Sequence, residues 1–234
     1  LPQLTQLQVS MTAQGLDLTV AGVFQLTVTV PTAASTLVAA STASADSGGE
    51  QIVEVWGDRC LALPAPNAVN HQLSQWLGQP CQLVYMPAAS DRRATHPRTQ
   101  ASQPVSFADG YPLLLISEAS LDDLNQRLDA PVPMNRFRPN LVVTGCAAFA
   151  EDTWQTIRIG AVTMDVVKPC SRCIITTTDQ QTGQRCPEPL RTLATYRGWD
   201  GKIWFGQNVM PVTSGTVNVG DQVDVIANAT ASNG

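Results

Sequence analysis

The segment KPCSRC at residues 168–173 carries the side chains best suited to chemistry, because it places two thiols, Cys170 and Cys173, three positions apart. A structural zinc site needs four ligands, commonly two C-x2-C pairs or one such pair with two histidines. Cys186 follows thirteen positions later without a partner, and the two histidines of the chain are remote and unpaired. The spacing therefore gives zinc only weak support.

Redox chemistry is a second possibility for this pair. A thioredoxin-type C-x-x-C opens a helix after a strand, whereas the β-branched run IITTTD after Cys173 predicts a strand. The iron–sulfur spacing C-x4-C-x2-C is missing from the sequence. A single thiolate acting as a soft ligand to a heavier metal remains, with the positive charges of Arg172 and Lys168 beside it. Two inert, partly buried thiols stay open as the alternative.

Residues 86–110 form the longest stretch without periodicity and contain Arg92, Arg93 and Arg98, three of the 14 basic residues. A long loop in a compact domain is often functional, and guanidinium groups suit phosphate or carboxylate. The segment therefore predicts either an anion-binding loop or, more simply, a solvated surface loop.

Two helices are expected to frame these segments. The spacing of apolar residues predicts a helix over 67–78 that ends at Gly78. A second helix is predicted within 117–133, with Ser120 as its N-cap and with the prolines after it as its end.

The remaining periodic segments indicate strands. Alternation predicts a hairpin over 156–167, and further strands are expected at 24–30, 36–40, 51–57, 81–87, 141–145, 216–220 and 222–226. Short strands at close spacing with two clear helices favour a mainly β (α+β) fold, a β-barrel with a few helices, over a parallel α/β sheet.

Composition excludes several classes of protein. The 234 residues have a net charge of −5 and 14% charged residues, which argues against a nucleic-acid-binding surface. No apolar run reaches the roughly 20 residues of a membrane span. The six cysteines do not form a small disulfide-dense scaffold, so a reducing, cytoplasmic location is expected.

Several longer motifs identify a family. The segments VVKPCSRCIITTTDQQTGQ, VSFADGYPLLLISEASLDDLN, FRPNLVVTGC, EDTWQTIRIG, EPLRTLATYR, FGQN and VGDQVDVI occur in order between about Val105 and Ile226. Together they resemble the MOSC domain (molybdenum cofactor sulfurase C-terminal domain), and most closely the bacterial reductases of N-hydroxylated bases and the mitochondrial amidoxime-reducing component. The resemblance implies a MOSC-type β-barrel over 101–228, a partial β-rich N-terminal MOSC-associated domain with the basic loop over 1–100, and a linker-like tail over 229–234.

The resemblance also implies the residues of the site. Cys173 matches the cysteine that binds molybdenum in a molybdenum-pterin (molybdopterin) cofactor, and Asp109 matches an aspartate near the metal. The residues implied to hold the cofactor are Arg138, Asn140, Ser171 and Arg172. Cys170 and the run Gly206–Asn208 receive no role, and Cys146 is expected to pack in the core. A family-level association with pyridoxal phosphate binding is also implied.

The function implied by the resemblance is two-electron N–O reduction of hydroxylaminopurines, hydroxylamines or amidoximes. A ferredoxin-like or flavin reductase donor would supply the electrons, and a 2Fe-2S cluster would lie only on a ferredoxin domain or partner outside this chain. The chain begins at Leu1 without an initiator Met, and it lacks the Lys-Ser motif and the aspartate–arginine strand with which family members begin. It is therefore expected to be a fragment, which is able to fold while lacking cofactor and activity.

Two alternatives to a reductase remain. The chain would be a sulfur or molybdenum-cofactor carrier if Cys173 held a persulfide. It would be a non-catalytic domain if the C-x-x-C were structural.

Overall fold

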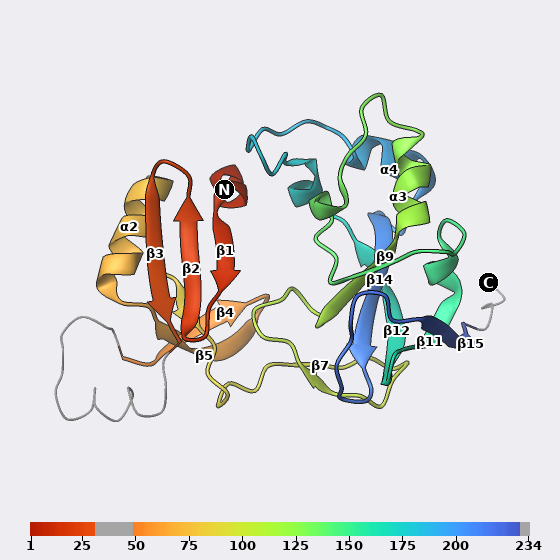
Figure 1. The fold of residues 1–234 in the computed structure, drawn as a ribbon, viewed down its shortest axis with the longest axis horizontal. Coiled ribbons are helices and arrows are strands. Elements are labelled where there is room, and N and C mark those ends of the chain that lie inside the picture. The colour runs from red at the N-terminus through yellow and green to blue at the C-terminus, as the bar shows by residue number, and fades with distance from the viewer. Residues whose placement is uncertain (31–48, 230–234) are drawn as a thin grey trace. The chain divides into compact units, whose positions relative to one another are not determined.

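A computed structural model describes residues 1–30 and 49–229 of the chain (Figure 1). The segments at 36–40 and 230–234, expected as a strand and as part of the tail, lie outside these residues. The chain forms two compact units, one of residues 1–92 with 181–183 and the other of residues 93–180 with 184–234.

The first unit consists of two small antiparallel sheets and a helix. The 3-10 helix η1 (Pro2–Gln6) leads into the sheet of β1 (Gln8–Met11), β2 (Gly15–Val20) and β3 (Phe24–Thr29). The second sheet contains β4 (Gln51–Val55), β5 (Asp58–Pro64) and β6 (Val84–Tyr85).

Helix α2 (Asn67–Leu77) completes this unit and confirms the prediction for this segment. Gly78 ends the helix with φ 68°, a left-handed conformation that favours glycine. On its apolar face Val69 and Leu73 join Leu18 and Val28 of the sheet in one core. The ring of Trp76 meets that of Phe24 edge-on at 5.6 Å.

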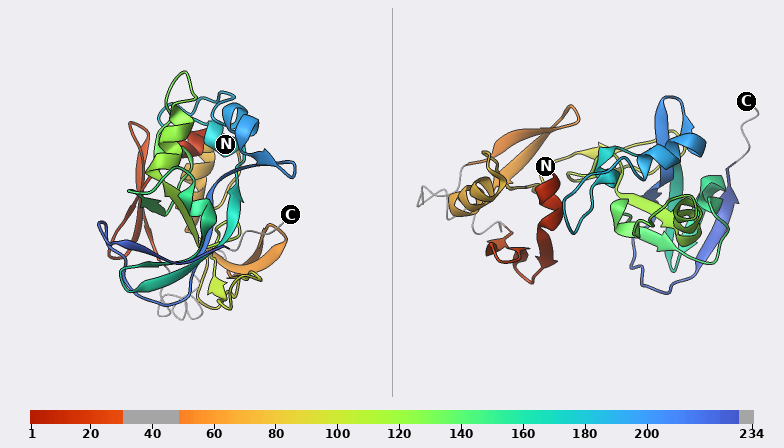
Figure 2. Two further views of the ribbon diagram at one scale, coloured as in Figure 1. Left: turned by 90° about the vertical axis from the view of Figure 1, so that its right-hand side faces the viewer. Right: turned by 90° about the horizontal axis from the view of Figure 1, so that it is seen from above.

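The second unit is built on a mixed sheet in the order β10–β9–β14–β12–β11–β15, with β13 paired to β14. Figure 2 shows the ribbon from two further directions. Its strands are β9 (Leu113–Ser117), β10 (Leu141–Val143), β11 (Trp154–Ile159), β12 (Val162–Ser171), β13 (Gly198–Trp199), β14 (Lys202–Pro211) and β15 (Val223–Asn228). β9 and β10 run parallel, and the other pairs are antiparallel. The predicted hairpin over 156–167 is confirmed as β11 and β12, and the curled, mainly β architecture confirms the predicted fold class.

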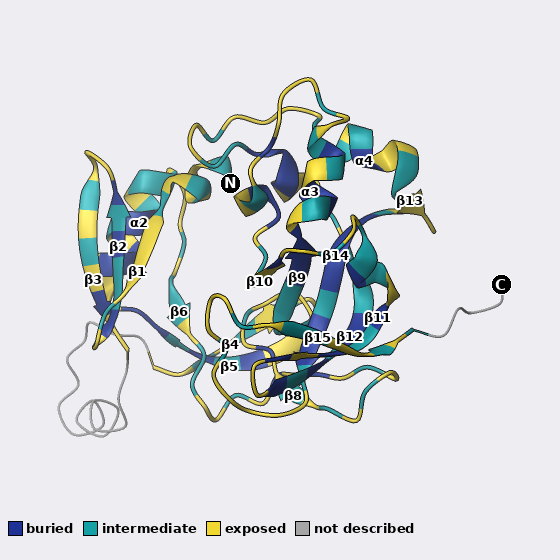
Figure 3. Ribbon diagram, turned by 45° about the vertical axis from the view of Figure 1, so that its right-hand side comes forward, coloured by how far each residue is buried: buried dark blue, intermediate teal, exposed yellow. Residues whose placement is uncertain are grey.

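Both faces of this sheet are covered. Because side chains alternate along a strand, Leu115 of β9 belongs to one core with Ile157 and Val209, while its neighbour Ile116 belongs to another with Phe137 and Phe205. The second core includes residues of α3 (Glu118–Asn125) and α4 (Leu190–Tyr196). Figure 3 shows the resulting buried band along β9 and β14.

Several sequence predictions differ from this structure. The N-cap of α3 is Ser117, whose hydroxyl accepts the Ser120 N–H at 3.1 Å, so the prediction of Ser120 was wrong. Helix α3 also ends at Asn125, before the prolines. α4 was not expected as a helix, and 81–87 forms a strand only at Val84–Tyr85.

The segment 216–220 is not a strand. The Asp221 carboxylate accepts the Asn218 N–H at 2.8 Å and closes a turn there. Residues 86–110 are also not one long irregular loop, because β7 (Arg93–Ala94) pairs with β8 (Gln103–Pro104).

Candidate active site

A cavity of about 310 Å³ opens in the second unit. Four stretches of the chain form its wall: the segment 107–114, the segment 136–140, the end of β12 with the 3-10 helix η4 (Ile174–Thr177), and β14. Polar and ionisable side chains supply much of the lining, namely Asp109, Tyr111, Arg136, Arg138, Asn140, Cys170, Arg172, Cys173, Thr176 and Asn208.

The cysteine segment reaches the cavity through an irregular strand end. β12 continues to Ser171, so Cys170 lies in a strand. The register between β12 and β14 shifts twice, between Val166 and Lys168 and between Pro169 and Ser171. Pro169 has no N–H for the ladder, and the Asn208 amide donates to the carbonyls of Lys168 and Pro169 at 3.3 and 3.2 Å. Such bulges bend a strand and redirect its side chains.

Cys173 is the second residue beyond this irregular end and the N-cap of η4. Its carbonyl accepts the N–H of Thr176 at 3.2 Å and the hydroxyl of the same residue at 3.0 Å. The residue is exposed and lines the cavity. The predicted strand after Cys173 was therefore wrong, because threonine hydroxyls bond back to the chain and form a short helix.

Arg172 contacts the other cysteine. Its guanidinium donates to Cys170 Sγ at 3.0 Å and to the Phe137 carbonyl at 2.7 Å, and lies 5.5 Å from the centre of the Phe137 ring. Lys168 Nζ lies 5.9 Å from the centre of the Tyr111 ring. The two cations expected beside Cys173 thus contact other residues: Arg172 contacts Cys170 and Phe137, and Lys168 lies over the ring of Tyr111.

Arg138 and Asn140 line the same cavity from the segment after the 3-10 helix η2 (Met134–Arg136). Asn140 is fixed by Leu114, whose N–H donates to its Oδ1 and whose carbonyl accepts its N–H, both at 2.9 Å. Arg138 has φ 54°, an unusual conformation for a residue with a side chain, and such positions cluster at functional sites.

The structure thus brings five of the six predicted site residues to one cavity: Asp109, Arg138, Asn140, Arg172 and Cys173. Ser171 is exposed, pairs with Trp204 and is not part of the lining. Arg92, Arg93 and Arg98 also lie outside the lining. The buried Arg92 instead forms an ion pair with Asp58 at 2.8 Å.

Sequence reasoning missed Arg136, which is only 7% exposed. Its guanidinium contacts the Asp179 carboxylate at 2.8 Å and the Thr176 carbonyl at 3.5 Å, and it lines the cavity. The buried Nε–H groups of Arg136 and Arg172 have no acceptor within the described residues. The pair of arginines in RFRPN was the available sequence signal.

Cys146, Gly206 and Gln207 contact the interior of the second unit. Burial and, secondarily, the Glu151 charge raise the pKa of Cys146, which packs against the core of the sheet. Gly206 has φ 78° and closely approaches β9, where an added Cβ would lie 2.6 Å from the Ile116 side chain. The Gln207 amide donates to Asp152 at 2.6 Å.

No cluster of three or more His, Cys, Asp or Glu side chains suited to a metal occurs in residues 1–30 and 49–229. None of the helices in the described parts of the chain combines the length and apolar character needed to cross a bilayer.

Comparison with known proteins identifies the family to which this fold and cavity belong. Residues 102–224 match the MOSC domain, and the chain belongs to that family. It is 40% identical over 167 residues to mitochondrial amidoxime-reducing component 1 of Homo sapiens, covering 64% of this chain and 50% of that protein.

Two further relatives carry related names. Mitochondrial amidoxime reducing component 2 of Bos taurus is 43% identical over 136 residues, with 54% of this chain and 40% of that protein covered. Molybdenum cofactor sulfurase of Oryza sativa subsp. japonica is 37% identical over 171 residues, with 66% and 21% covered. The chain spans about half the length of the amidoxime-reducing component 1 relatives that it matches.

Proposed function

We propose that the chain is the MOSC part of a molybdenum-pterin enzyme that reduces N-hydroxylated substrates, among them hydroxylaminopurines, hydroxylamines and amidoximes. One observation carries this proposal: an exposed thiol, Cys173, shares a cavity with three arginines, Arg136, Arg138 and Arg172. A soft ligand beside several cations suits a thiophilic metal held by an anionic organic group. The names of the relatives support the same assignment.

The residues present fit such a cofactor. A buried N–H without an acceptor is costly, and the Nε–H groups of Arg136 and Arg172 in the cavity wall find no acceptor in residues 1–30 and 49–229. An oxygen-rich, anionic ligand would bring acceptors and negative charge to this wall. In the proposal Cys173 binds the metal, while Arg138, Asn140 and Arg172 hold the pterin. Ser171 is retained as a cofactor-binding residue from the family resemblance alone.

The proposed reaction converts R–NH–OH, two electrons and two protons into R–NH2 and water. When bound, the molybdenum centre would supply the electron pair for N–O cleavage. The chain's own residues would bind and orient the reactants. Asp109, in the cavity wall, would orient the substrate or hold a proton beside it. A ferredoxin-like or flavin reductase partner would supply the electrons, and the proposed location is the cytoplasm.

Metal and pterin analysis tests this proposal directly. The protein is produced in a host that makes the cofactor, beside the variants Cys173→Ser and Cys186→Ser. Cys186 provides a matched control, because it is an exposed thiol outside the cavity lining. We expect molybdenum and pterin in the parent and in Cys186→Ser, and loss of molybdenum from Cys173→Ser. Zinc, or no metal in any of the three, would refute the reductase assignment.

A second candidate function follows from the name of the rice relative, molybdenum cofactor sulfurase. A carrier would hold a persulfide on Cys173 instead of a metal. Its expected signature is cyanide-labile sulfur that disappears in Cys173→Ser, with no molybdenum bound. The same three proteins therefore discriminate between the two functions.

A further inference from the structure

Tyr111 is a cavity residue to which the proposed function has given no role. It is half-buried in the wall between Gly110 and Pro112. Its ring meets that of His96 edge-on, with centroids 6.1 Å apart and planes at 64°. Lys168 Nζ lies near the same ring, on the strand that ends at the cysteine segment. Tyr111 therefore adjoins the strand that presents Cys173.

The direction of the Tyr111 ring is set by the protein itself. It packs against a cluster that includes Ala94, Val105 and Met210. His96 is also fixed, because its Nδ1 accepts the Arg98 N–H at 3.2 Å and its carbonyl accepts the Thr99 N–H at 3.1 Å. A side chain held in this way is preorganised for a ligand, which reduces the entropy cost of binding.

The Tyr111 hydroxyl is a donor that the protein leaves uncommitted. Within residues 1–30 and 49–229 no protein group accepts a hydrogen bond from it. Among the other donors of the wall, the Thr176 hydroxyl is bonded to Cys173 and Arg172 to Cys170 and Phe137. The Nε–H groups of Arg136 and Arg172, which lack acceptors within the described residues, are the donors assigned to the cofactor in the proposed function. Burial raises the pKa of Tyr111 above its ordinary value of 10.0. The phenol accordingly keeps its hydrogen throughout the neutral range.

We propose that Tyr111 recognises the oxygen of the substrate N–O group, donating a hydrogen bond to it and then a proton as the bond breaks. This inference rests on the proposed function. The proton moves from the phenol to the departing oxygen, which leaves as water, and the phenolate regains a proton from solvent. The second proton reaches the amine nitrogen from solvent, and the external donor supplies both electrons. Phenol is a much stronger acid than water, whose pKa is about 15.7, so protonation of a departing hydroxide is favourable.

Equilibrium binding provides a test that requires no turnover. Hydroxylaminopurine and adenine differ by the one oxygen atom that Tyr111 would contact. Their dissociation constants are measured on the oxidised, cofactor-loaded protein without an electron donor. Tyr111→Phe is expected to reduce the preference for hydroxylaminopurine about 2- to 10-fold and to leave adenine affinity unchanged, since one neutral hydrogen bond is lost. Tyr85→Phe, a change at an exposed tyrosine outside the cavity, is expected to retain the preference.

His96, whose ring packs against that of Tyr111, provides a second variant. His96→Gln removes the ring that holds Tyr111 and keeps the hydroxyl, so it is expected to reduce the preference by a smaller factor. In turnover, Tyr111→Phe is expected to lower kcat by about 10²- to 10⁴-fold, the usual contribution of a general acid. Molybdenum content and the thermal midpoint of each variant verify that the protein is folded and loaded.

Parental preference and kcat in both variants would overturn the inference. If Cys173→Ser still loses molybdenum in that case, the proposed function stands and only the role of Tyr111 fails. A Tyr111-dependent preference in a loaded protein that never reduces the substrate would support recognition of the oxygen and refute the reductase.

Discussion

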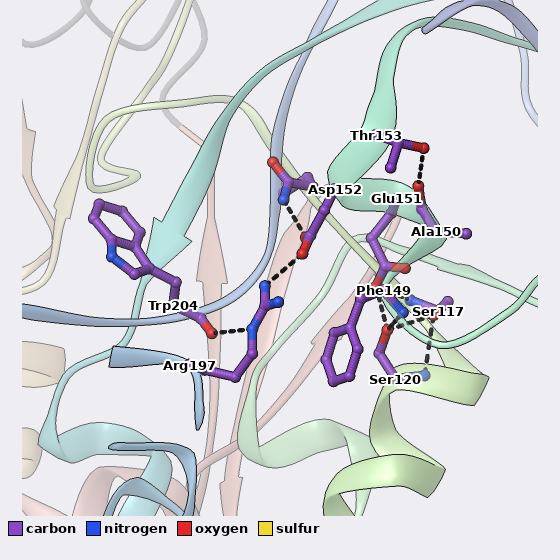
Figure 4. A network of polar contacts seen from close by, with 10 residues as sticks. Ser117, Ser120, Phe149, Ala150, Glu151, Asp152, Thr153, Arg197 and Trp204 are labelled. Carbon is purple, nitrogen blue, oxygen red and sulfur yellow. Dashed lines mark hydrogen bonds and ion pairs between the residues drawn. The ribbon is translucent and has the colours of Figure 1, made fainter. Parts of the chain in front are cut away.

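Two polar clusters in the second unit differ in how far protein groups supply partners for their polar atoms. One surrounds Asp152, whose carboxylate pairs with Arg197 at 2.7 Å and accepts the Gln207 amide at 2.6 Å (Figure 4). The adjacent carboxylate of Glu151 accepts from the Ser117 N–H and the Ser120 hydroxyl. In this cluster Glu151 Oε2 has no partner within the described residues, and Arg197 Nη2 meets Asp152 as an ion pair without hydrogen-bond geometry. The other polar groups named here are bonded to protein groups.

The second cluster is the cavity wall. The Arg172 guanidinium is bonded to a sulfur and a carbonyl, and buried N–H groups on Arg136 and Arg172 lack acceptors within the described residues. The difference distinguishes a cluster that maintains the fold from one arranged for a ligand. Two substitutions test this distinction directly, and two more probe charges next to each cluster; they follow from the largest expected effect to the smallest.

Asp152→Ala should have the largest effect on stability. It leaves the cation of Arg197, whose side chain is only 11% exposed, without its carboxylate partner. We expect a loss of about 3 kcal/mol in the free energy of unfolding, measured by denaturant titration. The folded fraction should still retain the cofactor. A selective loss of cofactor with unchanged stability would place Asp152 in the site.

Arg138→Ala should leave the stability of the protein nearly unchanged and weaken its retention of the cofactor. Its side chain is exposed, so the free energy of unfolding of the cofactor-free protein should change by less than about 0.5 kcal/mol. Pterin retention during dialysis should fall about 10- to 100-fold, because a charge-assisted hydrogen bond is lost. Arg158→Ala, at an exposed arginine outside the cavity, is the control. Equal retention in both variants would exclude Arg138 as an anchor.

Glu151→Gln removes the negative charge of the carboxylate whose Oε2 lacks a partner within the described residues, and it keeps nearly the same side-chain shape. Burial raises the pKa of Cys146 and the Glu151 charge adds to the effect, so removing the charge should lower that pKa toward its usual range. Titration of the thiol by carbon NMR, with labelled cysteine and Cys146→Ser for assignment, checks this. An unchanged thiol titration would show that the charge of Glu151 does not reach Cys146.

His96→Gln should have the smallest effect on the free energy of unfolding, and its effect on the pH dependence of stability should appear in acid. Burial, then the charges of Arg98 and Lys168, hold the pKa of His96 below 6.5. The unfolded chain then binds the proton more strongly, so stability contributed by neutral His96 is complete above pH 6.5 and declines as the pH falls below that value. Denaturant midpoints at pH 5 and pH 7.5 should differ less in His96→Gln than in the parent. An equal difference in both proteins would assign the acid sensitivity to other groups.

Local patterns predicted the helix α2 and the β11–β12 hairpin, and they missed α4. In the helix ending at Gly78 the apolar residues recur with helical spacing, and in the hairpin over 156–167 they alternate as in a strand. Prediction failed where side chains bond to the nearby backbone. The Thr176 and Thr177 hydroxyls donate to carbonyls three residues earlier, which stabilises η4 although β-branched residues favour strands.

The site was predictable only in part for a related reason. Motifs indicated Cys173, Arg138 and Asp109, but no local pattern reveals that segments near 109, 138 and 173 converge on one cavity. Arg136 and Tyr111 have neighbours that are distant in sequence, Asp179 and His96, so their places depend on tertiary packing.

The contact of Arg172 with both Cys170 and the Phe137 carbonyl limits how this site can be transplanted. Because one side chain ties the cysteine segment to the 136–140 segment, a protein engineer who grafts KPCSRC alone onto another barrel would transfer the thiols without their alignment. The smallest portable unit is the two segments together, with Asn208 to hold the irregular strand end.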